Sequence, residues 1–437
     1  MSDPVNEPSF RLDVAGLPDP FEVLTFTGKE AISEPFVFDV EVLIKAPALD
    51  LARLLYRPAV LHVGPQGNAF HGLLHALVQR DHGPGARRCQ VRLGPGLSCL
   101  GQRFSRRIFS DLSVPQILDQ VLKEHGIVGN GRRFELMGDH PLRDFCTQYR
   151  ESDLQFVQRL CAQAHIHYHF EHYPDRHCLV FGDGRGHFRL SETTVFEVDR
   201  EQPAVRQFQP HADRSTALMA EVCTDLPTLR SGQLMPLSGH PVADWNQLWL
   251  LTHVEHQGSQ DPVASYRNQL RAIHWEAPLA SPHHLHPPRM HSLQRAWVVD
   301  VDEPRPDPSR AVPVQFDWLY QGEGAAPSHC WLPLAAELGS PNATQLSEGT
   351  EVVVSFIDGD PDQPRISGFL QTPLAVGTED QAAPEPVVPD DPLVQLLRAG
   401  EPLLLLCLLP GGGSFIHCTQ TFCTCRAATR LGESGAA

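Results

Sequence analysis

The sequence lacks any apolar run long enough to cross a membrane. Its densest apolar stretch, 403–409, is far shorter than the roughly 20 residues that a membrane-spanning helix requires. The first residues, 1–7, have neither a basic start nor an apolar segment, so we expect no secretory signal peptide. There is also no long basic run that would mark a membrane-binding surface. These absences favour a protein that resides in the cytoplasm.

Recognisable catalytic and nucleotide-binding motifs are also missing. The sequence has no His-Glu-x-x-His pattern, no glycine-rich phosphate loop and no nucleophile elbow. The segment 96–101 misses the spacing of that elbow by one residue. We therefore expect a structural protein and not an enzyme, and we assign no catalytic residue, no cofactor and no metal ligand.

Positive charge is scarce. Lys and Arg number 35 against 52 Asp and Glu, which gives a net charge of −17. A surface that binds phosphates needs a basic field, so nucleic acid is excluded as the main partner. The 11 cysteines are mostly scattered singly, which suits reduced thiols in the cytosol better than a disulfide framework.

The sequence is instead rich in turn residues, with 39 prolines and 33 glycines. This composition favours many short strands over long helices. Apolar and polar residues alternate at 10–14, 36–42 and 59–63, which indicates an antiparallel sheet or barrel. A further strand is expected at 249–256. We predict a mainly β fold.

Two helices are expected inside this β-rich chain. Ser113 and Gln116 form the pattern of a capping box before an apolar helical face, and Gly126 stands where that helix should end. Ser152 and Gln155 repeat the start signal. After the second helix the apolar period becomes that of a strand, so this part of the chain is predicted to be α/β.

A compact set of strands follows a plausible domain boundary at 281–288. The five strands are expected at 296–301, 312–318, 330–335, 351–357 and 365–370. Five short strands in so short a segment suit a small closed barrel of the oligonucleotide/oligosaccharide-binding (OB) kind. A linker rich in Pro, Ala and acidic residues then covers 376–389.

The C-terminal segment 393–437 is the most unusual part of the sequence. Its apolar run, 396–407, is broken by the glycines 411–413 and resumes at 414–418. Because nothing downstream covers it, we interpret it as an oligomerisation element that copies of the chain bury against one another. The alternative is an ordinary core strand within one domain.

Several motifs together resemble those of one family. They lie at 106–110, 149–160, 266–268, 314–318, 330–334, 349–356, 359–364, 399–401 and 412–416. The most specific is Gly-Thr-Glu-Val-Val-Val-Ser-Phe at 349–356 followed by Gly-Asp-Pro-Asp-Gln-Pro at 359–364. They resemble VgrG, the spike protein of type VI secretion, which is related to the hub and spike of contractile phage tails. The resemblance covers nearly the whole chain.

The resemblance implies an architecture of tandem β-barrels with an α/β hub, an OB-fold barrel and a short triple-stranded β-helix formed in a trimer. The implied domains are a first hub barrel with an α/β insertion at 1–200, a second hub barrel at 201–290, an OB-fold neck at 291–373, a linker at 374–392, and a needle and tip at 393–437. Three equivalent chains with two barrels each can meet a sixfold ring. The linker is too short for a lysozyme domain, and the 12 residues from Arg426 to Ala437 are too few for a toxin.

The implied function is that of a homotrimeric spike that sits on the Hcp tube and delivers tip partners or effectors into target cells. Implied partners are the Hcp tube, a PAAR-repeat tip protein or effector, and baseplate components, with contact to the target membrane only on penetration. The chain would be cytoplasmic before firing and secreted through the apparatus without a signal peptide. Alternatives are the hub-spike of a prophage-like contractile tail and, from another class, a metal-dependent hydrolase.

Three clusters invite a metal hypothesis. His165, His167 and His169 alternate along an expected strand, but three ligands on one strand cannot close a tetrahedral site without outside help. The acidic segment 358–362 resembles the start of a calcium loop, yet its sixth and twelfth positions are wrong, so a turn is favoured. The remaining cluster is at the tip, where a trimer could gather thiols around zinc or iron. Its residues are His417, Cys418, Cys423 and Cys425.

Overall fold

The computed structural model describes most of the chain from residue 10 to residue 370, and two short strands beyond it. The described ranges are 10–45, 49–64, 68–83, 86–199, 202–212, 218–260, 265–279, 288–302, 309–310, 312–319, 329–338, 346–370, 405–408 and 414–417. The chain forms two compact units, residues 1–373 and 374–437. No helix in the described ranges is long and apolar enough to cross a membrane.

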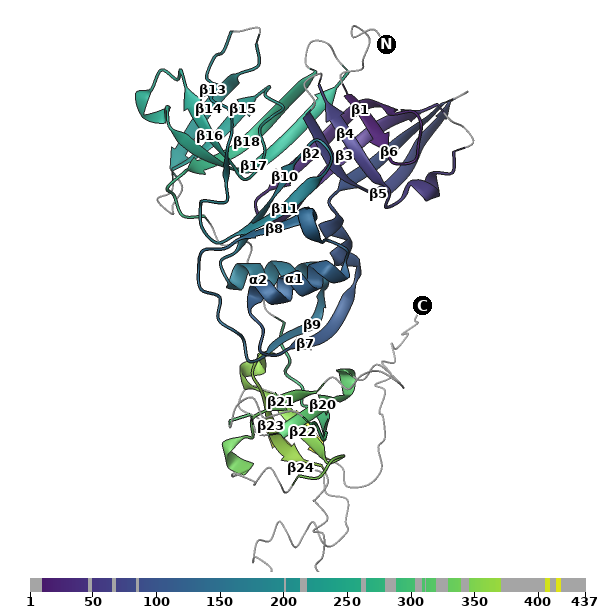
Figure 1. The fold of residues 1–437 in the computed structure, drawn as a ribbon, viewed down its shortest axis with the longest axis vertical. Coiled ribbons are helices and arrows are strands. Elements are labelled where there is room, and N and C mark those ends of the chain that lie inside the picture. The colour runs from purple at the N-terminus through teal and green to yellow at the C-terminus, as the bar shows by residue number, and fades with distance from the viewer. Residues whose placement is uncertain are drawn as a thin grey trace, which may run out of the picture. The chain divides into compact units, whose positions relative to one another are not determined.

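The first part of the chain is a closed antiparallel barrel (Figure 1). Its strands are β1 (Phe10–Val14), β2 (Phe21–Ala31), β3 (Glu34–Ile44), β4 (Pro58–Val63), β5 (Asn68–Gly83) and β6 (Ala86–Gly94). They follow the order β1-β4-β5-β6-β3-β2, and β2 pairs with β1 to complete the circle. Alternate residues of these strands are buried, as the sequence pattern predicts.

A half-barrel continues the same sheet. The edge of β2 is divided between two neighbours: residues 21–22 pair with β1, and residues 25–31 pair with β17. The half-barrel strands are β12 (Arg189–Leu190), β13 (Thr194–Val195), β14 (Val205–Ala212), β15 (Leu218–Thr224), β16 (Gln233–Ser238), β17 (Leu248–Ser259) and β18 (Tyr266–His274). The closed barrel and the half-barrel therefore share one 13-stranded sheet.

Glycines allow aromatic rings to cross the shared strands. A Cβ atom on Gly28 of β2 would lie 2.1 Å from the ring of Phe38, and one on Gly258 of β17 would lie 2.1 Å from the ring of Phe26. Real Cβ contacts are never that short. Glycine is thus required where the two barrels meet, because the rings occupy the space that a side chain would need.

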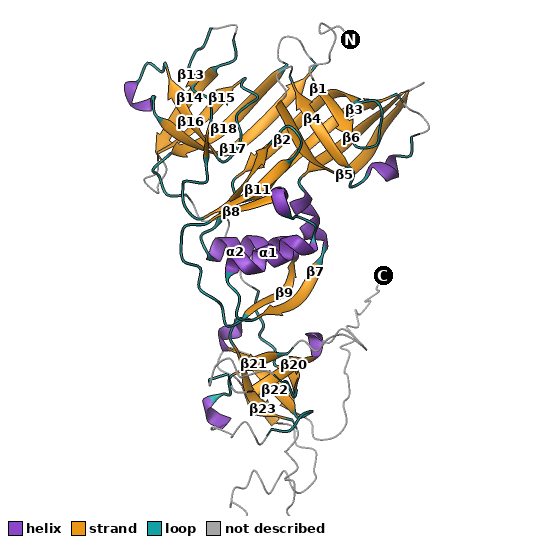
Figure 2. Cartoon of the chain, in the orientation of Figure 1, coloured by secondary structure: helices purple, strands orange, loops and turns teal. Residues whose placement is uncertain are grey.

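An α/β insertion lies between the two barrels in sequence. It contains β7 (Phe104–Phe109), α1 (Val114–Glu124), β8 (Arg132–Glu135), β9 (Cys146–Ser152), α2 (Asp153–Gln163), β10 (His167–His172) and β11 (His177–Gly182). Both expected helices are confirmed, with capping boxes at Ser113 and Ser152 and with Gly126 at φ 73°. The apolar faces of the helices join the core of the closed barrel in one cluster. Figure 2 shows the two helices, in purple, among the strands of the insertion.

The third part is a five-stranded barrel, which we call the neck barrel. Its strands are β19 (Gln294–Val298), β20 (Val312–Phe316), β21 (Cys330–Leu332), β22 (Glu351–Phe356) and β23 (Pro364–Phe369). A parallel bridge between Leu334 and Ile366 joins the two ends of the order β21-β20-β19-β22-β23. The five strands expected from the sequence are all present, and the mainly β fold class with its hub insertion and small barrel is confirmed.

Short 3₁₀ helices connect several of these elements. They are η1 (Leu51–Leu54), η2 (Gly96–Gln102), η3 (Gly129–Gly131), η4 (Ala243–Trp245), η5 (Asp317–Leu319), η6 (Ala336–Leu338) and η8 (Ile357–Gly359).

The second unit contributes one described element, an antiparallel hairpin of β24 (Leu405–Leu408) and β25 (Ser414–His417). The rest of 374–437, including most of the expected needle, lies outside the described residues. The trimeric β-helix therefore stays a prediction, as do the domain boundaries.

Candidate functional site

The sequence predicts one strand that carries His165, His167 and His169. In the structure this segment is β10 together with residues 165 and 166, which precede it. His165 is exposed at φ 53°, whereas His167 and His169 are buried. The ring of His169 lies 5.5 Å from that of His187 and packs where Gly232 leaves room for it. No three His, Cys, Asp or Glu residues in the described ranges are arranged to hold a metal ion. The hydrolase alternative gains no support from this strand.

The acidic segment 358–362 forms a tight turn between β22 and β23. Asp358 and Gly359 both adopt positive φ values, 51° and 72°. The carboxylate of Asp360 accepts hydrogen bonds from the backbone N–H of Asp362 at 3.0 Å and from the amide of Gln363 at 3.1 Å. The turn is thus closed by its own side chain, as an Asx turn is.

The last acid of this turn joins the neck barrel to the insertion, at a contact we call the hub–neck junction. The backbone N–H of Thr147 on β9 donates to the carboxylate of Asp362 at 2.5 Å, and the Thr147 hydroxyl donates to the carbonyl of Pro361 at 2.8 Å. Arg159 donates to the carbonyl of Thr147 at 2.9 Å and lies 4.0 Å from Asp362. Burial raises the pKa of Asp362, although Thr147 and Arg159 oppose the rise.

Further contacts of the hub–neck junction come from the other side of the neck barrel. Arg310 pairs with Asp111 at 3.0 Å and lies 3.7 Å from the carboxylate of Asp144. Phe145 packs within the apolar core of the neck barrel. The motif at 359–364, part of the most specific resemblance to the family, therefore acts in a contact between two parts of the chain that lie more than 200 residues apart in sequence.

A fully buried carboxylate, Asp153, organises the insertion at the start of α2. It accepts hydrogen bonds from Arg103 at 2.5 Å, Arg107 at 3.2 Å, Gln148 at 2.8 Å and His125 at 2.7 Å. Burial alone raises the pKa of Asp153, but these hydrogen bonds and charges outweigh it and hold the pKa below its usual range. Arg107 lies in the family motif at 106–110, and Asp153 lies in the motif at 149–160. The network therefore gives a structural role to one residue of each motif.

Sequence reasoning missed a second buried charged group, which we call the Glu30 cluster. Glu30 is only 4% exposed; its carboxylate lies 3.7 Å from His172 and 3.4 Å from His256 and accepts the backbone N–H of Ser231 at 3.4 Å. Arg230 completes the cluster through its charge. The members come from distant segments without a shared motif, so no local pattern could have identified them.

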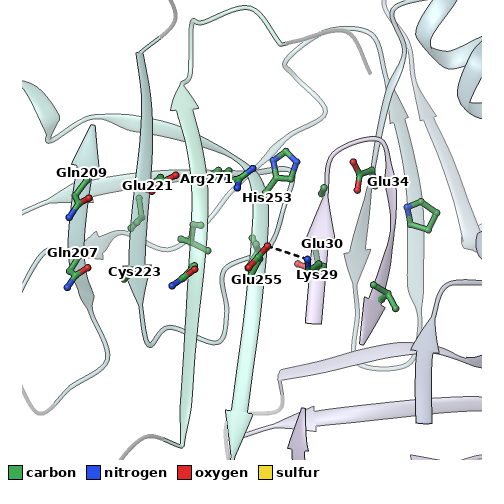
Figure 3. Close-up of a pocket in the computed structure, with 17 residues that line it drawn as sticks. Lys29, Glu30, Glu34, Gln207, Gln209, Glu221, Cys223, His253, Glu255 and Arg271 are labelled. Atoms are coloured by element: carbon green, nitrogen blue, oxygen red, sulfur yellow. Dashed lines mark ion pairs between the residues drawn. The ribbon is translucent and has the colours of Figure 1, made fainter. Parts of the chain in front are cut away.

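A polar hollow of about 470 Å³ lies on the sheet that the two barrels share (Figure 3). It is lined by residues of β2, β3, β14, β15, β17 and β18. Its charged side chains face opposite charges across the strands: Lys29 lies 3.6 Å from Glu255, and Glu221 stands opposite Arg271 in the register. Such paired charges suit a solvated face or a polar contact surface more than a catalytic centre.

The tip cluster cannot be placed. Cys418, Cys423 and Cys425 lie outside the described residues, and His417 is described only as the last residue of β25. The metal hypothesis for the tip therefore stays a prediction.

The chain is similar in sequence to known proteins. The family model described as the phage tail baseplate hub (GPD) matches residues 29–218. Two type VI secretion system spike proteins of Pseudomonas aeruginosa, VgrG4b and VgrG5, are 34% and 33% identical over 85% of this chain. The chain spans 57% and 58% of the length of these relatives.

Solved structures support the same fold. An E. coli protein, c3393, described as a type VI secretion component similar to the T4 tail proteins gp27 and gp5, matches 82% of this chain and 99% of its own length, with a TM-score of 0.70 and 23% identity. The Francisella PdpA-VgrG complex in its lidded form matches 94% of this chain and 75% of its own, with a TM-score of 0.52 and 8% identity. The chain is therefore a homologue of the VgrG spike proteins, and it carries the baseplate hub domain of phage tails.

Proposed function

We propose that the chain is the spike component of a type VI secretion apparatus and that it works as a homotrimer. The observation that carries this proposal is the identity of 34% to a named spike protein over 85% of the chain. The fold is consistent with it, because the same sheet supplies two barrel modules per chain. In a trimer, two similar modules per chain would give six contacts for a hexameric ring.

The C-terminal segment supports the trimer through its chemistry. The described hairpin of β24 and β25 is short, and isolated two-stranded hairpins are marginally stable in water. Six of its eight residues are Leu, Ile, Phe or Cys. Such a hairpin gains stability when other copies of the chain cover it, as in an intertwined β-helix without free sheet edges.

The partners follow from the same proposal. The trimer would sit on the Hcp tube, contact baseplate components and present a PAAR-repeat tip protein or an effector. It would reside in the cytoplasm until the apparatus fires and would meet the target membrane only on penetration. Its work would be mechanical, so we propose no enzymatic step for the chain.

The mass of the particle in solution tests the trimer. We expect analytical ultracentrifugation of the full chain to give three times the 48.5 kDa protomer, and deletion of 393–437 to give mostly protomers. A control in which Gly and Ser replace the linker 376–389 keeps the C-terminal segment and should stay trimeric. Only protomers at micromolar concentration in the full chain would contradict the proposal.

The second candidate is the hub-spike of a prophage-like contractile tail, which the baseplate hub match favours. Purified full chain can be mixed with Hcp hexamers or with phage tail-tube protein and analysed by co-sedimentation. Binding to Hcp supports the secretion apparatus, whereas binding to the tail tube alone supports the phage-like tail.

A further inference from the structure

We propose that the Glu30 cluster is an acid-sensitive lock that holds together the closed barrel, the α/β insertion and the half-barrel. The lock is closed at neutral pH, and it loosens when His172 and His256 take up protons. This inference concerns the described hub alone and does not depend on the proposed secretion function.

Each part of the hub supplies a member of the lock. Glu30 lies on β2 of the closed barrel, His172 ends β10 of the insertion, and His256 lies on β17 of the half-barrel. Arg230 comes from the segment before β16, where it donates to the carbonyls of Pro227 and Leu229 and stacks over a barrel ring, that of Phe70, at 4.0 Å. The cluster therefore contacts all three parts of the fold, and loss of its contacts would loosen their packing while the backbone ladder between β2 and β17 remains.

The hydrogen bonds fix where the protons of the His172 imidazole reside. Its Nδ1 atom accepts the backbone N–H of His71 at 3.3 Å, so that nitrogen carries no proton. The proton of a neutral ring must then be on Nε2, the atom that faces Glu30. The neutral ring of His172 thus turns its N–H toward Glu30 in the closed state.

The same argument applies to His256. Asn268 donates to the hydroxyl of Tyr266 at 3.2 Å, and that hydroxyl lies 2.6 Å from Nδ1 of His256. Nε2 of His256 lies 3.4 Å from the Glu30 carboxylate, which favours the tautomer with the ring proton on Nε2 and leaves Nδ1 to accept the hydroxyl proton of Tyr266. The motif residues Tyr266 and Asn268 thereby acquire a role: they orient His256.

The charges of the closed lock balance without charged imidazoles. Burial alone raises the pKa of Glu30, but the nearby imidazoles of His172 and His256 and the charge of Arg230 hold that pKa well below its usual range. Burial lowers the pKa of both imidazoles, and Arg230 lowers them further, while Glu30 opposes the change. A proton added to either ring would displace a donor from Nδ1 and leave a surplus positive charge in the interior.

The neighbouring titratable groups do not supply a negative charge that would balance the added proton. Element by element they are His62 on β4, His71 on β5, Asp175 in the turn between β10 and β11, His177 on β11 and Tyr266 on β18. Asp175, the carboxylate of this set, is 69% exposed and ion-paired with Arg176. His177 has a pKa that burial lowers to about 4, so it too resists protonation.

The direction of the pH effect follows from these states. When the lock opens, both imidazoles return to water and to a pKa of about 6.5. The open state then binds more protons than the closed state whenever the pH falls below that value. At pH 5.5 this favours opening by up to about tenfold for each histidine, and thus by up to about a hundredfold for both.

Hydrogen–deuterium exchange of the full chain between pH 7.5 and 5.5, corrected for intrinsic exchange rates, tests the lock. We expect peptides from 167–182 and 248–259 to lose protection in acid, while peptides from β20 in the neck barrel keep theirs. In a His172→Gln, His256→Gln double variant, glutamine keeps a donor near Glu30 but does not titrate. In acid, the opening constant of this variant should therefore rise less than that of the wild type, by up to about a hundredfold.

A control variant and the wild type keep the test decisive. His253→Gln changes an exposed histidine on the same strand, β17, and should leave the wild-type pH dependence unchanged. The proposal is overturned by flat wild-type protection in both hub segments, by an equal loss in β20, or by a double variant that follows the wild type. If the double variant does not fold, the wild-type series alone still decides between the first two outcomes and the expected one.

Discussion

Two carboxylates join parts of the molecule, a fully buried one inside the insertion and a partly buried one at the hub–neck junction, and their surroundings differ in kind. Asp153 receives four side-chain donors, two of them arginines, and its pKa is lowered. Asp362 receives the backbone N–H of Thr147, lies 4.0 Å from Arg159, and has a raised pKa. Burial acts on both acids, so the number and charge of the donors decide the sign of the shift.

The difference teaches how the two regions are held. The insertion is assembled around an ionised carboxylate that pairs with Arg103 and Arg107, which also pair with Glu124. The hub–neck junction depends on the hydrogen bonds of Thr147, the apolar contacts of Phe145 and the ion pair of Arg310 with Asp111, and we expect the charge of Asp362 to add little to it. We therefore expect the two acids to respond unequally to the same substitution.

The largest effect is expected for Asp153→Asn. The amide retains the shape but removes the buried charge that Arg103 and Arg107 face. Because Glu124 still pairs with both arginines, we expect a loss of about 3 kcal/mol, the lower end of the cost of breaking a buried pair. Chemical denaturation followed by circular dichroism measures the loss. A loss below about 1 kcal/mol would show that water or rearranged arginines replace the carboxylate, and the comparison with Asp362 would fail.

A smaller effect is expected for Thr147→Val at the hub–neck junction. Valine keeps the volume of threonine but removes the hydroxyl that donates to the carbonyl of Pro361. We expect a loss of about 1 kcal/mol, because a buried carbonyl is left without its partner. Limited proteolysis between the neck barrel and the hub, together with denaturation, reports it. Thr147→Ser, which keeps the hydroxyl, is the matched control and should retain most of the stability.

The smallest effect at neutral pH is expected for Asp362→Asn. The amide oxygen of asparagine can still accept the N–H of Thr147, and the lost charge was only partly compensated. We expect a change within about 1 kcal/mol in either direction, measured as for Asp153→Asn. A loss as large as that of Asp153→Asn would mean that Arg159 depends on this carboxylate, contrary to the comparison.

The pH dependence of the two acids should have opposite signs. A raised pKa means that folded Asp362 binds more protons than the unfolded chain above pH 3.8, so its contribution to stability falls as the pH rises through that window. A lowered pKa means that the contribution of Asp153 is present above 3.8 and is lost below it. The stability of Asp362→Asn relative to wild type should therefore improve from pH 4.5 to 7. An unchanged difference between the two proteins across this range would contradict the assignment.

Local patterns in the sequence were sufficient for most of the architecture. The capping boxes at Ser113 and Ser152 located both helices, because their hydrogen bonds join residues three positions apart. Strands β1 and β19–β23 followed from alternation and turn residues for the same reason. The motif at 359–364 identified the family before its physical role at the hub–neck junction was known.

Contacts between distant segments could not be derived in this way. Glu30, His172, Arg230 and His256 meet only because β2, β10 and β17 pack together, and each residue looks ordinary in its own strand. The contact of Thr147 with Asp362 joins residues 215 positions apart. The short strands β12 and β13 were also missed, since two residues are too few to show any period.

The division of the β2 edge between β1 and β17 has a mechanical consequence. The closed barrel and the half-barrel are not linked by a hinge but by one continuous ladder of backbone hydrogen bonds. A load applied to one of them along the strands is carried in shear by many such bonds at once, and no single bond bears it alone. The two barrels should therefore deform together under an applied force, as one rigid unit.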